Sequence, residues 1–175
     1  MKGRMIGLAV FAVACALSSG IATSDEDAGA APDITLDRVL REHPDLRGAY
    51  ETLRATPSAA TANTDPFEVA MARLLEISGE RREEAAVLVA TFLDNENWGI
   101  RQDAVGALGG LRVASYIPEV VKRLDDTELG VRLAAIGACA ELGAKSAIPR
   151  IARFLAEEPG ESIYACPRFY AAAAL

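Results

Sequence analysis

The sequence predicts an all-α protein, namely an α-solenoid of stacked antiparallel helix hairpins preceded by a signal peptide and a flexible tether. Two observations lead to this prediction. A residue pattern recurs with a shift of 31 positions, first seen in the pair Leu93 and Leu124, and the apolar residues of each copy follow helical spacing. The composition agrees, because 51% of the 175 residues are hydrophobic, which is enough for one folded domain.

Residues 1–22 have the composition of an export signal. Lys2 and Arg4 form a short basic start, an uncharged apolar run follows, and small residues come next. The apolar run is too short to span a bilayer as a stop-transfer helix. Two processing sites remain open, which are ordinary cleavage after Ala22 and lipidation at Cys15, where the preceding residues resemble a bacterial lipobox. A buried N-terminal helix is the structural alternative.

We therefore expect an exported protein, periplasmic or extracellular, with a membrane-anchored lipoprotein as the alternative. Residues 23–33 are acidic and poor in large apolar side chains, which predicts a flexible tether. Residues 34–64 form a short helical segment and a linker, and Pro44 divides the segment into two helices or kinks it. Residues 65–175 form the repeat domain, whose last repeat is incomplete.

Twelve identities relate residues 93–126 to residues 124–157, and they indicate a duplicated structural unit. They are Leu93/Leu124, Asp94/Asp125, Gly99/Gly130, Arg101/Arg132, Ala104/Ala135, Gly106/Gly137, Ala107/Ala138, Leu111/Leu142, Ser115/Ser146, Ile117/Ile148, Pro118/Pro149 and Leu124/Leu155. Each unit carries two apolar stripes at helical spacing. A two-helix unit cannot bury both stripes by itself, so the units must stack.

This pattern predicts helix hairpins over 66–93, 97–125 and 128–156, without strands. The hydroxyls of Ser115 and Ser146 are expected to cap the second helices. Pro118 and Pro149 are then expected in the first turn of those helices. The residues expected to be buried are Ile100, Leu108, Leu111, Ile117, Val120, Leu124, Ile148, Ile151 and Leu155.

The string Leu-Asp-x4-Gly-[Ile/Val]-Arg-x2-Ala-x-Gly-Ala, followed by Ser-x-Ile-Pro-x5-Leu, resembles the HEAT-repeat family. It looks most like the short variety named after phycobilisome lyases. The resemblance is specific over residues 93–157, which hold two complete repeats. Residues 67–93 fit one degenerate hairpin upstream, and residues 168–175 begin a further hairpin downstream. The resemblance implies a solenoid that binds or scaffolds other proteins.

Asp94 and Arg101, with their copies Asp125 and Arg132, pair carboxylates with guanidinium groups in a way that could suggest catalysis. The family resemblance instead implies a structural ladder, in which the arginine ties the turn of one repeat to the next. We expect no catalytic residues, no cofactor and no metal site. The one histidine, His43, lies in a predicted turn and has no second histidine to complete a metal site.

The second helices carry the one charge distribution that suggests a binding site. Residues 110–154 contain seven Lys/Arg against five Asp/Glu, although the whole chain has a net charge of −7, which becomes −9 if Lys2 and Arg4 leave with the signal. We hypothesise that another protein binds there through an acidic segment. The candidate residues are Lys122, Arg123, Arg150 and Arg153. The alternative is a solvated helix surface.

Trp98 occupies the turn position that Leu129 fills in the next unit. It is expected to pack between repeats, with a ligand platform as the alternative. A disulfide between Cys139 and Cys166 is disfavoured, because the repeat alignment separates them by about 13 Å of helix rise. The longer loop before Cys166 could shorten this distance, so the disulfide stays an alternative.

The function expected from the sequence is an exported protein-binding module that is not an enzyme. The alternative is an enzyme-associated module resembling the bilin lyase proteins, although export counts against it. A HEAT-like DNA glycosylase is disfavoured, since an acidic protein lacks the basic surface that nucleic acid requires. Contact with a membrane is expected only through a lipid on Cys15.

Overall fold

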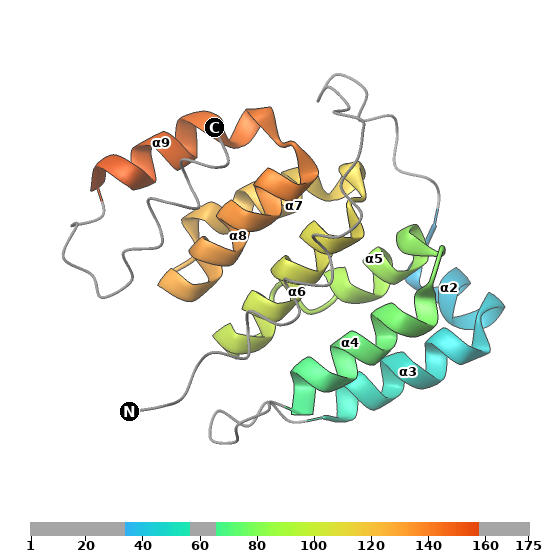
Figure 1. The fold of residues 1–175 in the computed structure, drawn as a ribbon. Helices are drawn as coiled ribbons and strands as arrows, with labels where there is room; N and C mark the ends of the chain where they lie inside the picture. Colours follow the sequence, from blue (N-terminus) through green and yellow to red (C-terminus); the bar gives the residue numbers. More distant parts are fainter. Residues whose placement is uncertain (1–33, 57–65, 158–175) are drawn as a thin grey trace.

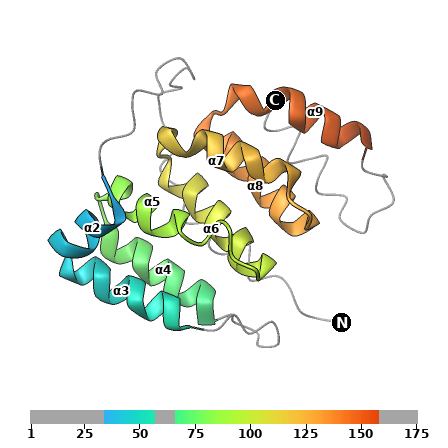
Figure 2. The same cartoon turned by 180° about the vertical axis from the view of Figure 1, so that it is seen from behind.

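The computed structural model describes residues 34–56 and 66–157, and every regular element in these ranges is helical. Figure 1 shows the helices crossing the molecule in sequence order, from α2 and α3 at one end to α9 at the other, and Figure 2 shows the same order from behind. The α-helices are α2 Leu36–Glu42, α3 Pro44–Ala55, α4 Pro66–Ser78, α5 Arg82–Ala90, α6 Trp98–Leu111, α7 Ile117–Lys122, α8 Leu129–Leu142 and α9 Ile148–Glu157.

The predicted hairpins are confirmed over residues 66–157. Short 3₁₀ turns complete the second helices, and these are η3 Ala114–Tyr116, η4 Arg123–Asp125 and η5 Lys145–Ala147. Upstream, the chain divides at Pro44 into α2 and α3, as the proline predicts, because it occupies the first turn of α3. The predicted signal, tether and incomplete last repeat lie outside the described residues. Among the helices that the structure does describe, none is long and apolar enough to cross a bilayer.

One aspect of the hairpin prediction is wrong, namely the capping of the second helices. Ser115 and Ser146 do not sit at the N-caps, because each lies within a 3₁₀ turn that leads directly into the second helix. The cap of α7 is Tyr116, and its side chain accepts no hydrogen bond. Backbone bonds replace the expected cap, since the amide of Tyr116 donates to Val113 and the amide of Ala147 donates to Ala144.

One continuous hydrophobic core runs through the described helices. Seven of the nine residues expected to be buried are buried, namely Ile100, Leu108, Leu111, Ile117, Val120, Leu124 and Ile151. Ile148 is the exception, with 38% of its surface exposed at the start of α9. The equivalent Ile117 also follows a 3₁₀ turn but is buried, so the turn itself does not explain the difference. The side chain of Leu155 lies outside the described residues.

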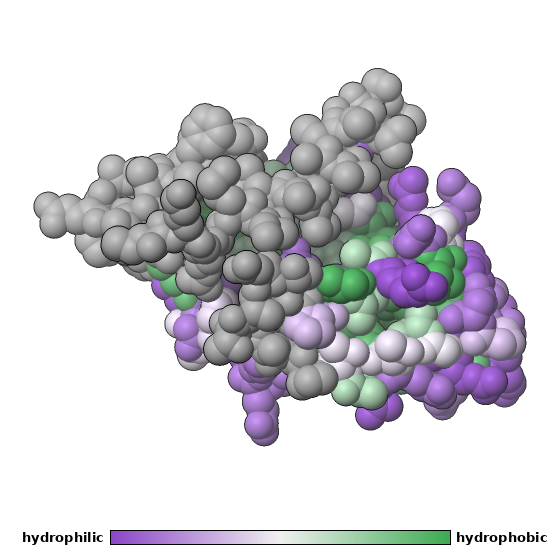
Figure 3. Space-filling view, turned by 60° about the horizontal axis from the view of Figure 1, so that its bottom comes forward, coloured by the Kyte–Doolittle hydropathy of each residue, from purple (hydrophilic) through white to green (hydrophobic). Residues whose placement is uncertain are grey.

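Aromatic rings join the N-terminal helices to the repeats. Phe92, which follows α5, packs edge-on against Tyr50 of α3 and Phe67 of α4, with ring centroids 5.8 and 5.4 Å apart. The hydroxyls of Tyr50 and Thr91 lie 3.0 Å apart. In the view of Figure 3, on the part of the surface not drawn in grey, hydrophobic residues lie together and hydrophilic residues surround them. The two N-terminal helices therefore cover the end of the hairpin that α4 and α5 form.

Both first helices of the duplicated unit end with a residue in the left-handed conformation. Arg112 follows α6 with φ of 56°, and Gly143 follows α8 with φ of 66°. The two positions are equivalent under the 31-residue shift. The turn that reverses the chain therefore has the same backbone geometry in both units, although only Gly143 adopts it without a Cβ penalty.

Candidate interaction surface

The turns between repeats are held by two equivalent arginines, one in each first helix. Nη1 of Arg101 donates to the carbonyls of Asn95 and Glu96, at 2.8 and 3.1 Å. Nη1 of Arg132 donates in the same way to the carbonyls of Asp126 and Thr127, at 2.9 and 3.0 Å. Each guanidinium thus satisfies carbonyls of its own turn, and this fixes the start of its helix.

Arg101 also connects one repeat to the next. Its Nε and Nη2 donate to the two carboxylate oxygens of Asp126, at 3.0 and 2.8 Å, and the side chains are only 12% and 6% exposed. These hydrogen bonds hold the pKa of Asp126 below its usual range, with a smaller contribution from the Glu128 amide. The ladder between repeats therefore exists, but its acidic partner is Asp126 rather than Asp94 or Asp125.

Asp94 and Asp125 pair instead with cations on the second helix of the following repeat. Nη2 of Arg123 donates to Asp94 at 2.7 Å, which lowers the pKa of that carboxyl. Asp125 lies 3.0 Å from Nη2 of Arg153 and 3.4 Å from Nη1 of Arg150. The acidic residue that ends one second helix thus faces basic residues of the next.

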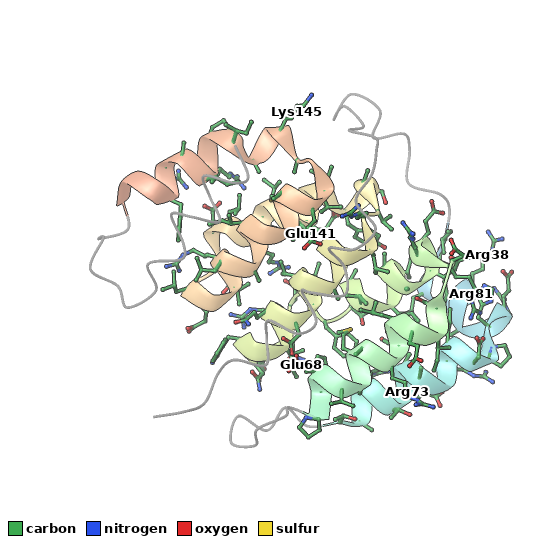
Figure 4. All side chains as sticks on the ribbon, viewed as in Figure 1. Arg38, Glu68, Arg73, Arg81, Glu141 and Lys145 are labelled. Carbon is green, nitrogen blue, oxygen red and sulfur yellow. The ribbon has the colours of Figure 1, made fainter. Side chains whose placement is uncertain are left out.

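Lys122, Arg150 and Arg153 are exposed, and we call these three residues the basic ridge. Arg150 also donates from Nη1 to the carbonyl of Val121 at 3.1 Å, which holds its guanidinium across the two repeats. Figure 4 shows Lys145, the basic residue of the turn before α9, pointing away from the protein. The exposed side chain of Ile148 adds an apolar group to this surface near the start of α9.

Arg123 differs from the other three candidate residues. Its side chain is 12% exposed, and it occupies the position that the next repeat fills with the buried Phe154. Nε of Arg123 is buried and has no hydrogen-bond partner among the described residues. The side chain of Arg123 is therefore largely covered and engaged with the exposed Asp94, and it does not belong to the basic ridge.

Trp98 begins α6 and lies at the junction of the two first helices. A Cβ placed on Gly130 would be 3.2 Å from Cζ3 of Trp98, so the indole is held against the backbone of α8. The packing between repeats that the sequence predicts is therefore present. The side chain is nevertheless 40% exposed, so that both expectations for this residue have a physical basis.

His43 lies at the junction of α2 and α3 beside an arginine hub. Arg81 donates to both carboxylate oxygens of Asp45, to two carbonyls at the end of α4 and toward Nδ1 of His43. The hydrogen bonds from Arg81 to the Asp45 carboxylate lower the pKa of Asp45 to about 2. Nε2 of His43 lies 3.9 Å from Glu84. Arg81 therefore ties the turn before α3 to the turn before α5.

The described residues contain no group of His, Cys, Asp and Glu side chains that could hold a metal ion. Cys139 is buried within α8, while Cys15 and Cys166 lie outside the described residues. The ion pairs of the repeats fix turns and connect helices. The arrangement is suited to presenting a rigid surface to a partner.

The sequence did not predict the position of the Glu141 carboxylate or the close approach of Gly109 in α6 to Ala138 in α8. Glu141 lies between α6 and α8, and Figure 4 shows it in the middle of the molecule. Burial raises the pKa of this carboxyl, partly opposed by Arg112. Glu141 is aligned with Gly110, so the departure from the repeat at that position was the available signal.

The comparisons with known proteins agree with the repeat geometry. A family model described as HEAT repeats matches residues 85–165, which include α6, α7 and α8 entirely. No curated protein matches the chain.

Proposed function

Because residues 85–165 of this chain are HEAT repeats, we propose that the protein is an exported, non-catalytic module that binds an acidic segment of another protein on the basic ridge. The helical repeats themselves suggest a protein-interaction module. The finer proposal rests on Lys122, Arg150 and Arg153, which are exposed at successive second helices while the chain as a whole is acidic.

The carrying observation is that the arginines of the ridge are held in place before any partner binds. Asp125 and the Val121 carbonyl fix the guanidinium of Arg150, and Asp125 also pairs with Arg153. Both contacts of Arg150 use its Nη1, so Nε and Nη2 of this guanidinium form no hydrogen bond with other described residues. A partner carboxylate can engage these donors on a side chain that is already held in place, which lowers the entropic cost of binding.

The test uses a labelled peptide that alternates glutamate and glycine, followed by fluorescence anisotropy. Reversing Lys122 and Arg153 to glutamate should weaken binding roughly tenfold and flatten its dependence on salt, because ridge charges act mainly on the association rate. The matched control reverses Arg41 and Arg47, which are exposed on α2 and α3 and change the net charge equally. Equal losses in both double variants would contradict a localised site.

Export is tested separately on the natural protein. The N-terminal sequence of residues 1–22 supports it, and N-terminal mass analysis of fractionated cells gives the readout. We expect a mature chain that begins at Thr23, or at a lipid-modified Cys15. An intact Met1 in the cytoplasmic fraction would contradict export and leave the ridge hypothesis unaffected.

A further inference from the structure

Trp98 is an exposed aromatic side chain whose position is fixed by a neighbouring helix. Gly130 allows the indole to approach α8 closely, and Gln102 lies on the same side, since a Cβ on Gly130 would be 2.5 Å from its Oε1. The side chain is still 40% exposed. A ring that is held along one edge and open elsewhere has lost its rotamer freedom before a partner arrives, which favours binding.

Among the described residues, arginines lie over two other aromatic rings but not over that of Trp98. Arg54 lies over Tyr50 with 5.7 Å to the ring centroid, and Arg132 lies over Phe154 at 5.8 Å. Within the described residues Trp98 has no comparable cation and no stacked ring. Trp is the best of the aromatic residues for such contacts, so an available site remains on it.

Two exposed carboxylates lie in the turns on either side of Trp98, and one of them, Glu128, also interacts electrostatically with Arg101. Glu96 is two residues before it, and Glu128 is two residues before Gly130, on which the indole rests. Both are exposed, and neither forms a hydrogen bond or ion pair through its carboxylate with other described residues. Asp94 and Asp126 in the same turns are each paired with an arginine. Glu96 and Glu128 are therefore carboxylates of these turns that no described cation holds by a hydrogen bond.

We propose that Trp98, Glu96 and Glu128 form a surface that binds an arginine side chain presented by a protein partner. A guanidinium stacks on an aromatic face and donates to carboxylates in its own plane, which an ammonium group does less well. This Trp98 surface has the opposite charge preference to the basic ridge. It therefore adds a second contact of different chemistry to the one proposed above.

Trp98 is the single tryptophan of the chain, so its fluorescence reports on the site directly. The full-length protein is titrated with a peptide that alternates arginine and glycine, and with matched lysine and glutamate peptides. We expect a saturable change in emission with the arginine peptide, a weaker one with lysine and none with glutamate. Vesicles of neutral phosphatidylcholine test the competing idea of a membrane contact.

The variants separate binding from packing. Trp98→Leu introduces the residue of the equivalent position 129, which keeps an apolar side chain over Gly130 but removes the aromatic face. It should retain the melting temperature of the parent and lose at least about tenfold in affinity for a labelled arginine peptide, measured by anisotropy. Glu96→Gln with Glu128→Gln should weaken binding similarly, whereas Glu76→Gln with Glu83→Gln, exposed on α4 and α5, should not.

Three results would overturn the proposal. The arginine peptide could leave the emission of Trp98 unchanged, or Trp98→Leu could bind it as tightly as the parent chain. The vesicles could shift the emission when the arginine peptide does not, which would assign the surface to a membrane. None of these outcomes depends on the basic ridge, whose variants change other residues.

Discussion

The backbone of Gly109 in α6 lies directly against Ala138 in α8. A Cβ built on Gly109 would come within 2.7 Å of the Cα of Ala138, closer than real Cβ atoms approach backbone. Gly110, the next residue, has nothing nearer than 4.0 Å. The spacing of the two first helices therefore depends on one missing methyl group.

We expect Gly109→Ala to lower the free energy of unfolding by about 1–3 kcal/mol, because the helices must separate to admit the methyl group. Gly110→Ala is the matched control, and it should be neutral or stabilise by up to about 1 kcal/mol through helix propensity. Denaturant titration of both variants measures the difference. Equal effects of the two substitutions would show that α6 and α8 are not in close contact.

Asp126→Asn should destabilise the protein by about 2–3 kcal/mol. The guanidinium of Arg101 is largely buried, and the substitution removes the carboxylate that is paired with it. Asparagine keeps one oxygen that can accept from the Glu128 amide and from Nη2 of Arg101, but its NH2 group cannot accept from Nε, so the change removes the charge and one hydrogen bond. Asp125→Asn, whose carboxylate faces exposed arginines, should cost less than about 1 kcal/mol. Thermal or chemical unfolding of the pair distinguishes a connecting ion pair from a surface one.

Glu141→Gln should raise the free energy of unfolding near pH 7 and leave it unchanged near pH 3. Burial raises the pKa of Glu141 above its unfolded value, so the folded state retains a proton more readily than the unfolded state. Its ionised form therefore destabilises the fold, and the penalty grows as pH rises through the folded pKa. A variant that is no more stable than the parent at neutral pH would place this carboxylate in water.

Asp45→Asn should flatten the loss of stability in acid. The pKa of Asp45 falls from 3.8 to about 2 through the hydrogen bonds from Arg81, so its contribution is complete above the unfolded pKa and is lost as pH falls through about 2. Asp37→Asn, an exposed residue of α2, is the control. Unfolding curves between about pH 4 and pH 2 that remain parallel to those of the parent would exclude the Arg81 contact in solution.

Local sequence rules predict the elements of this fold well. The 31-residue repeat gives the hairpins, and helical spacing identifies buried residues such as Leu108 and Val120. The same rules misplace Ser115 and Ser146, because a serine before a proline-started helix fits an N-cap and a 3₁₀ turn equally well. The exposure of Ile148 is also not predicted by the repeat, because the equivalent Ile117 is buried.

The partners of charged residues were harder to predict than their positions. The alignment identifies Asp94 and Asp125 as equivalent, and it identifies Arg101 and Arg132 likewise. It does not specify that Arg101 reaches Asp126, one residue beyond the aligned aspartate, because that depends on how far one repeat rotates on the next. The alignment does pair Arg123 with the apolar Phe154, and this was the available sign that the side chain of Arg123 is largely covered.

The packing of each helix mainly against helices near it in the sequence also determines which parts of the protein unfold locally. The interface between α6 and α8 is the most extensive of the described contacts, while α2 touches mainly α3 and α5. Amide protons in the middle of α6 and α8 should consequently exchange with deuterium only when the whole domain unfolds, whereas those of α2 exchange through local fraying. Such mostly local contacts also permit rapid folding, with the central helix pair as the natural place for the nucleus.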